Sequence, residues 1–256
     1  MASKALVAVA YGEKYERQTD RMVDSFMAHN QGWDVLRYYG GDLNALLPAP
    51  CRNWTPFNKC ELGRWLALRE ALGTYRTALY CDGDVRWYGR YPTGSHAMSL
   101  TPHYVTEAAK RQAKHWIWKD GAANIGIVEM RQHEQTDELF DFIIGEVLHR
   151  PMSYMHGDQL WLQNIVSSVP DCGFDCVFSR NAGLNVARWN LRKGDRALER
   201  TDGGKVQVVT ADGERYPLLA FHFSSKSLKD LDLCGDVAVE LKKQYMEEAA
   251  SRGKSE

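Results

Sequence analysis

The sequence has almost no excess charge of either sign, and it has no long apolar run. Its 256 residues include 32 Lys+Arg and 33 Asp+Glu, which gives a formal net charge of -1. This balance excludes a global attraction to nucleic acid or to an anionic membrane, although a local patch is still allowed. The apolar run ALVAVA near the N-terminus is too short for a signal peptide or a membrane span, so we expect a buried strand there.

A paired cysteine framework is also missing. Cys172 and Cys176 are close in sequence, but no second cysteine or histidine pair lies nearby to complete a zinc site. Free thiols in a reducing compartment are expected for a chain of this size, which favours a cytoplasmic protein. Neither an internal repeat nor a linker is visible, so we expect a single domain over residues 1–256.

The spacing of apolar residues predicts an α/β fold. The chain opens with a strand, an amphipathic helix and a second strand, an order that favours a mixed, mostly parallel sheet flanked by helices. The segment 180–216 is polar and rich in turn signals, and we expect it to be irregular. The expected strands are 4–10, 33–39, 77–81, 124–129 and 218–223, and the expected helices are 15–29, 58–73, 135–149, 156–166 and about 235–252.

Asp82-Gly83-Asp84 follows directly after the apolar strand expected at 77–81. Ligands of open α/β sheets bind beyond the carboxyl ends of the strands, and paired carboxylates suit Mg²⁺ or Mn²⁺. The spacing alone is weak, because 18 Asp residues produce about one such pair by chance. Asp230-Leu231-Asp232 has the same spacing in a charged segment, where we interpret it as solvated surface.

His222 lies between two phenylalanines on the expected last strand. A nitrogen ligand there would complete a site that two aspartates leave open. A histidine that is merely satisfied within the core is the alternative. Lys226 follows shortly afterwards, where it would either neutralise a diphosphate or remain a solvated lysine.

Two polar clusters border apolar elements, and each contains side chains that suit sugar hydroxyls. Asn124 precedes Gly126 in one cluster, and Asp158 precedes Gln159 in the other. Amide groups both donate and accept hydrogen bonds, as hydroxyl groups require. Asp158 is also a good N-cap for the helix expected at 156–166, and the local pattern favours that role.

These segments, taken in order, resemble the GT-A glycosyltransferases over about residues 4–230, and more closely those of bacterial and phage type. The resemblance is carried by ALVAVAYGEKY, FNKCELGRWLALREAL, TALYCDGDVRWYG, AANIGIVEMR, HGDQLWLQ, LNVARWNLRK and LLAFHFSS. It implies a Rossmann-like GT-A fold and the transfer of a sugar from a nucleotide-diphosphate donor to an acceptor hydroxyl.

The resemblance also implies a role for each matching position. Asp82, Asp84 and His222 would hold Mn²⁺ or Mg²⁺ at the diphosphate of a nucleotide sugar, among which a UDP-sugar is favoured. Asp158 and Gln159 would lie at the catalytic centre, between the sugar and the acceptor. The donor would be bordered by Tyr11, Gly12, Tyr15, Lys59, Asp82, Asn124, Gly126, Asn185, Trp189, Asn190 and Lys226.

The acceptor is left open by the sequence. Residues 110–119 interleave basic and aromatic side chains, and Arg188, Arg192, Lys193 and Arg196 form a second basic group. Such patterns suit nucleic acid, so a hydroxylated DNA base is one conceivable acceptor. We prefer the alternative of a solvated helix with two core-facing tryptophans, because the overall charge is neutral.

The same residues are compatible with two alternative functions. The first is a catalytically silent protein that binds a sugar nucleotide or a glycan, against which the intact Asp82, Asp84 and His222 argue. The second is a nucleotidyltransferase, which is disfavoured because no Gly-rich basic loop follows the first strand. The oligomeric state, and whether the anomeric configuration is retained or inverted, are not indicated by the sequence.

Overall fold

The structure is a computed structural model that describes residues 3–112, 123–149, 175–224, 228 and 230–252. The helix expected at 156–166 lies outside the described residues. In chain order the elements are β1 (Lys4–Ala10), α1 (Glu13–Met27), β2 (Asp34–Tyr39), α2 (Gly40–Leu46), the 3₁₀ helix η1 (Ala49–Asn53), α3 (Pro56–Leu72), β3 (Thr77–Cys81), β4 (Val85–Trp87), β5 (Met98–Pro102), α4 (Glu107–Gln112), β6 (Ala123–Arg131), α6 (Thr136–His149), β7 (Cys176–Phe178), β8 (Val186–Ala187), α9 (Arg188–Arg192), β9 (Arg196–Arg200), β10 (Val206–Thr210), β11 (Arg215–Pro217), β12 (Ala220–His222), the 3₁₀ helix η2 (Leu231–Leu233) and α11 (Asp236–Arg252).

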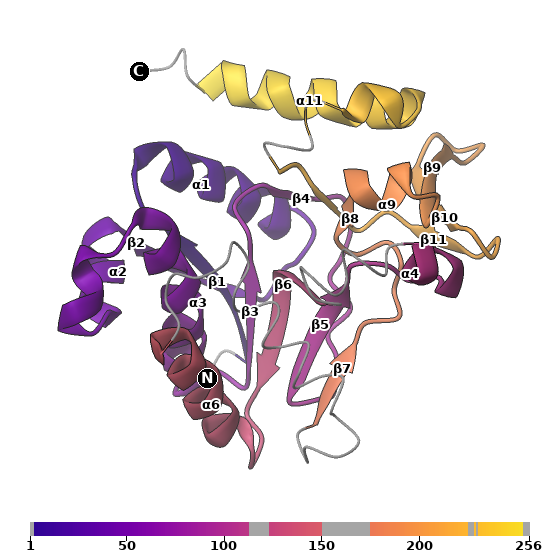
Figure 1. Cartoon of the computed structure of the whole chain (residues 1–256). Helices are drawn as coiled ribbons and strands as arrows, with labels where there is room; N and C mark the ends of the chain where they lie inside the picture. Colours follow the sequence, from indigo (N-terminus) through magenta and orange to yellow (C-terminus); the bar gives the residue numbers. More distant parts are fainter. Residues whose placement is uncertain (1–2, 113–122, 150–174, 225–227, 229, 253–256) are drawn as a thin grey trace.

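The central sheet has six strands in the order β2-β1-β3-β6-β5-β7 (Figure 1). β1 pairs in parallel with β2 and β3, and β5 pairs in parallel with β7, whereas β6 runs antiparallel to both of its neighbours. The prediction of a mixed, mostly parallel sheet is therefore confirmed. The carboxyl ends of β1 and β3 meet at one edge, where ligand sites of such sheets form.

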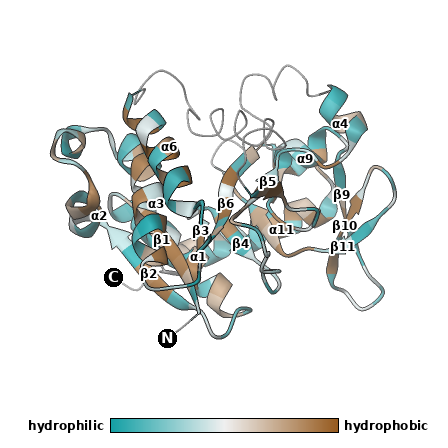
Figure 2. Ribbon diagram, turned by 90° about the horizontal axis from the view of Figure 1, so that it is seen from below, coloured by the Kyte–Doolittle hydropathy of each residue, from teal (hydrophilic) through white to brown (hydrophobic). Residues whose placement is uncertain are grey.

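Helices cover both faces of this sheet. Val7 and Val9 of β1 pack in one core with α3 and α6, while Leu6 and Ala8 pack in a second core with α1. Both faces of β1 are thus buried, which explains its continuous apolar sequence. Figure 2 shows β1 and β6 as largely apolar strands enclosed by helices of mixed polarity.

A second layer is formed by two small sheets and the C-terminal helix. One sheet has the order β4-β12-β8 and the other the order β11-β10-β9 (Figure 1). α11 packs on a third core together with β12, and there the ring of Tyr245 stacks on Phe223 with centroids 4.4 Å apart. No helix in the described part of the chain is long and apolar enough to cross a lipid bilayer.

The prediction that 180–216 is irregular is wrong. This segment contains β8, α9, β9, β10 and most of β11. The turn signals at Asp202-Gly203-Gly204 and Asp212-Gly213 are hairpin turns between antiparallel strands. The spacing of apolar residues did not predict these strands because the sheet is mostly exposed. In β10, for example, only Val208 and Thr210 are buried.

Candidate metal centre and donor site

Asp82 and Asp84 lie between two short strands that belong to different sheets. β3 ends at Cys81 in the central sheet, and β4 begins at Val85 in a small sheet. The backbone N–H of Asp82 donates to the carbonyl of Gly126 over 2.8 Å, which attaches the loop to β6. The loop is therefore held at the carboxyl edge of the central sheet, as the sequence predicts.

Strand pairing brings His222 to this loop from the far end of the chain. β12 runs antiparallel to β4, with His222 opposite Val85. The next residue, Phe223, donates its N–H to the carbonyl of Asp84 over 2.8 Å. This register sets the imidazole directly beside the Asp84 side chain.

The three side chains converge as a possible cation site. His222 Nε2 lies 2.9 Å from Asp84 Oδ1 and 4.0 Å from Asp82 Oδ2. One ligand atom from each residue lies within 4.8 Å of the others. The carboxylate side chains of Asp82 and Asp84 remain 29% and 22% exposed, so an ion can reach them from solvent. Two carboxylate oxygens and an imidazole nitrogen are donors that suit Mn²⁺ and Mg²⁺.

Gly126 leaves the space that these side chains occupy. A Cβ at this position would lie 3.0 Å from His222 Cε1 and 3.1 Å from Asp82 Oδ2. The same Cβ would lie 3.0 Å from Oδ1 of Asn124, which accepts the Gly126 N–H over 2.8 Å. Asn124 and Gly126 therefore form the floor of the cluster. Their predicted contact with the donor sugar remains a prediction.

A chain of hydrogen bonds fixes the orientation of the His222 ring. The Thr101 hydroxyl donates to the backbone carbonyl of Asn124, so its oxygen accepts from Nδ2 of Asn185. The Asn185 amide must then present its oxygen to Nδ1 of His222, at 3.2 Å. Since that oxygen only accepts, Nδ1 carries the proton and Nε2 faces the carboxylates. This is the tautomer that a metal ligand requires.

The charges of the cluster are strongly interdependent. Burial alone would lower the pKa of His222, but the carboxylates of Asp84 and Asp82 outweigh burial and raise it to about 9. Burial would likewise raise the pKa of Asp84, yet the adjacent imidazolium lowers it overall. For Asp82 burial dominates over the attraction of Arg64 and the pKa is raised. In the absence of a cation, a proton on His222 balances part of the negative charge.

Two residues that the sequence did not single out hold Asp82 in place. The Tyr80 hydroxyl donates to Asp82 Oδ1 over 2.6 Å, and the Arg64 guanidinium lies 3.9 Å from the same oxygen. The Arg64 guanidinium also lies 5.2 Å from the centroid of the Tyr80 ring. An arginine within an otherwise apolar stretch of α3 was the available signal for this partnership.

Tyr11 and Lys59 meet at the end of β1, next to the loop after β3. Lys59 Nζ lies 4.1 Å from the centroid of the Tyr11 ring and donates to Asn44 Oδ1 over 3.0 Å. Lys59 is only 5% exposed, and within the described residues it forms no ion pair with a carboxylate. A buried cation without an acid partner suits an anionic ligand. Asn44, on α2, was missed because its sequence surroundings carry no motif.

The other residues predicted to border the donor range from exposed to fully buried. Gly12 caps α1 with φ at +94°, a conformation that favours glycine, while Tyr15 on α1 is 55% exposed. Trp189 meets His222 edge to face, with centroids 5.6 Å apart. Asn190 is fully buried and accepts the Ala187 N–H over 2.9 Å, which makes it a brace for α9. The predicted roles of these residues toward a donor remain predictions.

Three predicted site residues are not part of the described structure. Asp158, Gln159 and Lys226 lie outside the described residues, so their expected roles stay predictions. The same is true for most of the basic and aromatic stretch 110–119.

In the structure, three residues of the second basic group are buried or paired with an acid. Arg196 is buried, with Nε 3.2 Å from Asp195, and it donates to backbone carbonyls, so it is not available to a nucleic acid. Arg188 and Arg192 both form ion pairs with Asp230. Asp230 therefore binds arginines rather than lying free in solvent, and its pair with Asp232 forms no metal cluster in the described part of the chain.

Comparison with known proteins finds relatives in structure only. No protein-family model and no curated protein sequence matches the chain. A glycosyltransferase involved in glycosylation of the major capsid of PBCV-1 is similar, with a TM-score of 0.53 and 10% identity over 96% of this chain and 99% of that one. The galactosyltransferase LgtC, crystallised with donor and acceptor sugar analogs, gives a TM-score of 0.53 and 14% identity over 96% and 95%. An active-site mutant of LgtC gives 0.55 and 15% over the same shares.

The chain therefore has the GT-A fold of these glycosyltransferases. At such identities the likeness establishes the fold, and activity must be argued from the site itself. On this fold the Asp82, Asp84 and His222 cluster lies at the carboxyl edge of the central sheet, beside the pair formed by Tyr11 and Lys59.

Proposed function

We propose that the protein is a metal-dependent glycosyltransferase that moves a sugar from a nucleotide-diphosphate donor, favoured to be a UDP-sugar, to an acceptor hydroxyl. The convergence of Asp82, Asp84 and His222 is the observation that carries this proposal. These residues would hold Mn²⁺ or Mg²⁺, which would supply positive charge to the leaving diphosphate. A cytoplasmic, single-domain enzyme is part of the same proposal.

The residues around the cluster have separable tasks. Asn185 keeps the His222 imidazole turned toward the carboxylates, and Tyr80 with Arg64 holds Asp82. Lys59, beside Tyr11, offers a buried positive charge to the nucleotide end of the donor. Positioning of this kind lowers the barrier because the reactants are held in the reactive geometry before reaction.

The reaction exchanges one bond at the anomeric carbon for another. The bond from this carbon to the diphosphate oxygen breaks, and the acceptor oxygen forms the new glycosidic bond. The nucleoside diphosphate leaves with the bonding electron pair. The proton of the acceptor hydroxyl passes either to a carboxylate, for which Asp158 is the predicted candidate, or to the leaving phosphate.

The experiment that tests the proposal is a thermal-shift screen of UDP-, GDP- and dTDP-sugars with and without Mn²⁺. A ligand that binds the native state raises the melting temperature according to its affinity and concentration. We expect a UDP-sugar to raise the melting temperature only when Mn²⁺ is present. Slow hydrolysis of the bound UDP-sugar, with water as the acceptor, should then release UDP. The absence of any shift with every donor would contradict the proposal, and a shift without turnover for any acceptor would favour a silent binding protein.

A further inference from the structure

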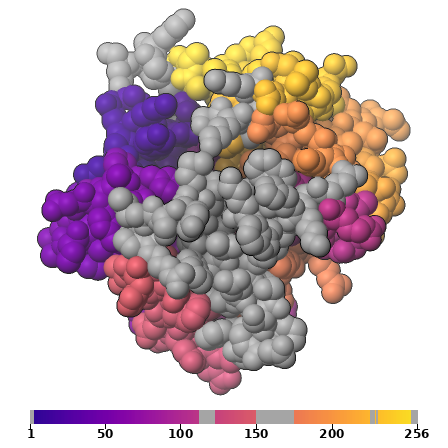
Figure 3. All heavy atoms as spheres, viewed as in Figure 1, coloured from indigo at the N-terminus to yellow at the C-terminus, as the bar shows by residue number. Residues whose placement is uncertain are grey.

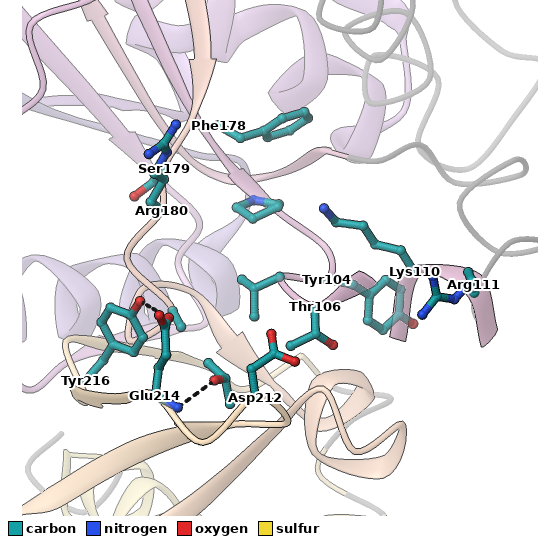
Figure 4. A pocket seen from close by; sticks show the side chains of 14 residues that line it. Tyr104, Thr106, Lys110, Arg111, Phe178, Ser179, Arg180, Asp212, Glu214 and Tyr216 are labelled. Carbon is teal, nitrogen blue, oxygen red and sulfur yellow. Dashed lines mark hydrogen bonds between the residues drawn. The ribbon is translucent and has the colours of Figure 1, made fainter. Parts of the chain in front are cut away.

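A cavity near the second layer is separate from the metal centre. It has a volume of about 920 Å³ and is enclosed by the end of β5, by α4, by the segment after β7 and by the β10–β11 hairpin (Figure 4). None of Asp82, Asp84 or His222 lines it. Sites for small ligands range from roughly 300 to 1,000 Å³, so this cavity is large enough for an extended ligand.

One indole side chain connects this cavity with the metal centre. Trp189 packs against the cluster of Tyr104 and Ala109, and Tyr104 lines the cavity. The same indole meets the His222 ring edge to face at 5.6 Å. Trp189 therefore contacts both a residue that lines the cavity, Tyr104, and a predicted metal ligand, His222. Figure 3 shows α4 at the surface beside the segment that carries α9 and the small sheet.

The lining combines ring faces with hydrogen-bonding groups. The Tyr216 hydroxyl donates to Glu214 over 2.6 Å, and the Glu214 N–H donates to Thr210 Oγ1 over 3.1 Å, which together hold this wall (Figure 4). Carboxylates accept hydrogen bonds from hydroxyl groups, and lysine and arginine donate to them. A sugar ring has an apolar C–H face and a rim of hydroxyls, so it matches both kinds of group.

Among the described residues, three cations and two carboxylates line the cavity, and a third carboxylate outside the lining pairs with one of the cations. Lys110, Arg111 and Arg180 line the cavity together with Asp212 and Glu214. Lys110 is in addition neutralised by Glu107, at 2.6 Å. A nucleic acid would bring its phosphates toward the two hairpin carboxylates and would gain little from a lysine that is already paired. The balance therefore favours an uncharged, hydroxyl-rich ligand.

We propose that this cavity binds a neutral carbohydrate chain, and that this chain is the acceptor whose reacting end extends past Trp189 toward the metal centre. The proposal rests on the function proposed above. It identifies the acceptor as a glycan held by the β9–β11 sheet, where the sequence left glycan, lipid, protein and DNA open.

An array of defined neutral and acidic oligosaccharides, with single-stranded DNA spots on the same slide, tests the proposal with the labelled full-length chain. We expect the chain to bind neutral oligosaccharides. Tyr216→Ala should lower the apparent affinity on the order of tenfold, because an aromatic contact is lost. Glu214→Gln should weaken the same spots, and it tests the site without removing a ring. Lys205→Ala, on the exposed turn between β9 and β10, is the matched control and should change nothing.

Charge reversal distinguishes the two macromolecular classes. Asp212→Lys removes a hydroxyl acceptor and should weaken the neutral glycans, whereas it would strengthen binding if DNA were the ligand. The proposal is overturned by stronger binding to DNA or acidic glycans, by binding to no glycan, or by glycan binding that Tyr216→Ala and Glu214→Gln leave intact. The Mn²⁺-dependent thermal shift with UDP is measured on the same samples. If the unaltered chain shows no such thermal shift, the proposed function is contradicted. If it shows the shift but no glycan binding that depends on the cavity residues, only the acceptor assignment is contradicted.

Discussion

The side-chain oxygen of Asn185 lies 3.2 Å from Nδ1 of His222. This contact turns Nε2 of the imidazole toward Asp84 and Asp82 and leaves that nitrogen available for a cation. Asn185 itself has a φ of +51°, which is uncommon for a residue other than glycine. Asparagine is among the non-glycine residues that adopt this conformation most readily, so it suits the position that orients the predicted metal ligand.

Removal of the Asn185 amide should weaken metal binding more than folding. We expect Asn185→Gly to lower the affinity for Mn²⁺ by about 10- to 100-fold, the range found for partners of metal ligands. Glycine tolerates the positive φ, so strain is not introduced. Asn185→Asp keeps an acceptor for Nδ1–H and should retain most of the affinity. Titration calorimetry with Mn²⁺ checks both, and equal affinities for Asn185→Gly and the unaltered chain would refute the orienting role.

A methyl group at position 126 should disturb the same cluster from below. Gly126→Ala places a Cβ about 3 Å from both His222 and Asp82. We expect at least a tenfold loss of Mn²⁺ affinity with a modest fall in melting temperature. Gly145→Ala on α6 is the control, because a Cβ there meets nothing within 4 Å. That control should bind Mn²⁺ normally and gain roughly 0.5–1 kcal/mol of stability, since alanine favours a helix.

The stability of the metal-free protein should fall at alkaline pH. The folded-state pKa of His222 is raised from 6.5 to about 9 by Asp84 and Asp82, and its other neighbours, Asn185 and Trp189, are uncharged. A raised histidine pKa contributes stability that is fully present below 6.5 and is lost as the pH rises through 9. The difference amounts to at most about 3 kcal/mol.

Urea unfolding between pH 6 and pH 9.5, with His222→Gln as the reference, measures this loss. Mn²⁺ should bind more tightly over the same interval, because it competes with the proton on Nε2. A stability profile identical to that of His222→Gln would show that the imidazole does not carry the proposed charge.

Nucleotide binding should depend on the buried lysine at the end of β1. We expect Lys59→Met to weaken UDP binding by about tenfold or more while Mn²⁺ binding stays within a factor of about two, because a charge-assisted contact is worth ~1.5–3 kcal/mol. Asn44→Ala should weaken UDP binding less. Lys14→Ala, whose ammonium lies 5.8 Å from the Tyr15 ring centroid, is the control for a nearby lysine that lacks these partners. Unchanged UDP affinity in Lys59→Met would remove Lys59 from the donor site.

The sequence predicted the parts of the structure whose signals are local. Thr77–Cys81 is a fully buried strand, and Asp82 and Asp84 follow it at the sheet edge as expected. From the residues alone, His222 was either a third ligand or a core histidine, and the family resemblance implied that it contacts the two aspartates. It depends on the pairing of β4 with β12, a long-range register that no local pattern contains.

Sequence analysis did not predict the elements that are built largely from polar residues. The strands Arg196–Arg200 and Val206–Thr210 are largely exposed, so their alternation is weak. Arg196 was counted in a basic group that would suit nucleic acid, yet it is buried with its partner Asp195, which also accepts from the N–H groups of Val105 and Thr106. Burial of a charged pair follows from tertiary packing, which composition does not reveal.

The most direct test of the account is to locate the cation. Crystals grown with Mn²⁺ and UDP, measured at the manganese absorption edge, should give an anomalous peak bounded by Asp82, Asp84 and His222. His222→Ala crystals, as the paired sample, should show a weaker peak or none. A peak at another place, or no peak in crystals that contain bound UDP, would contradict the metal centre on which the proposed function depends.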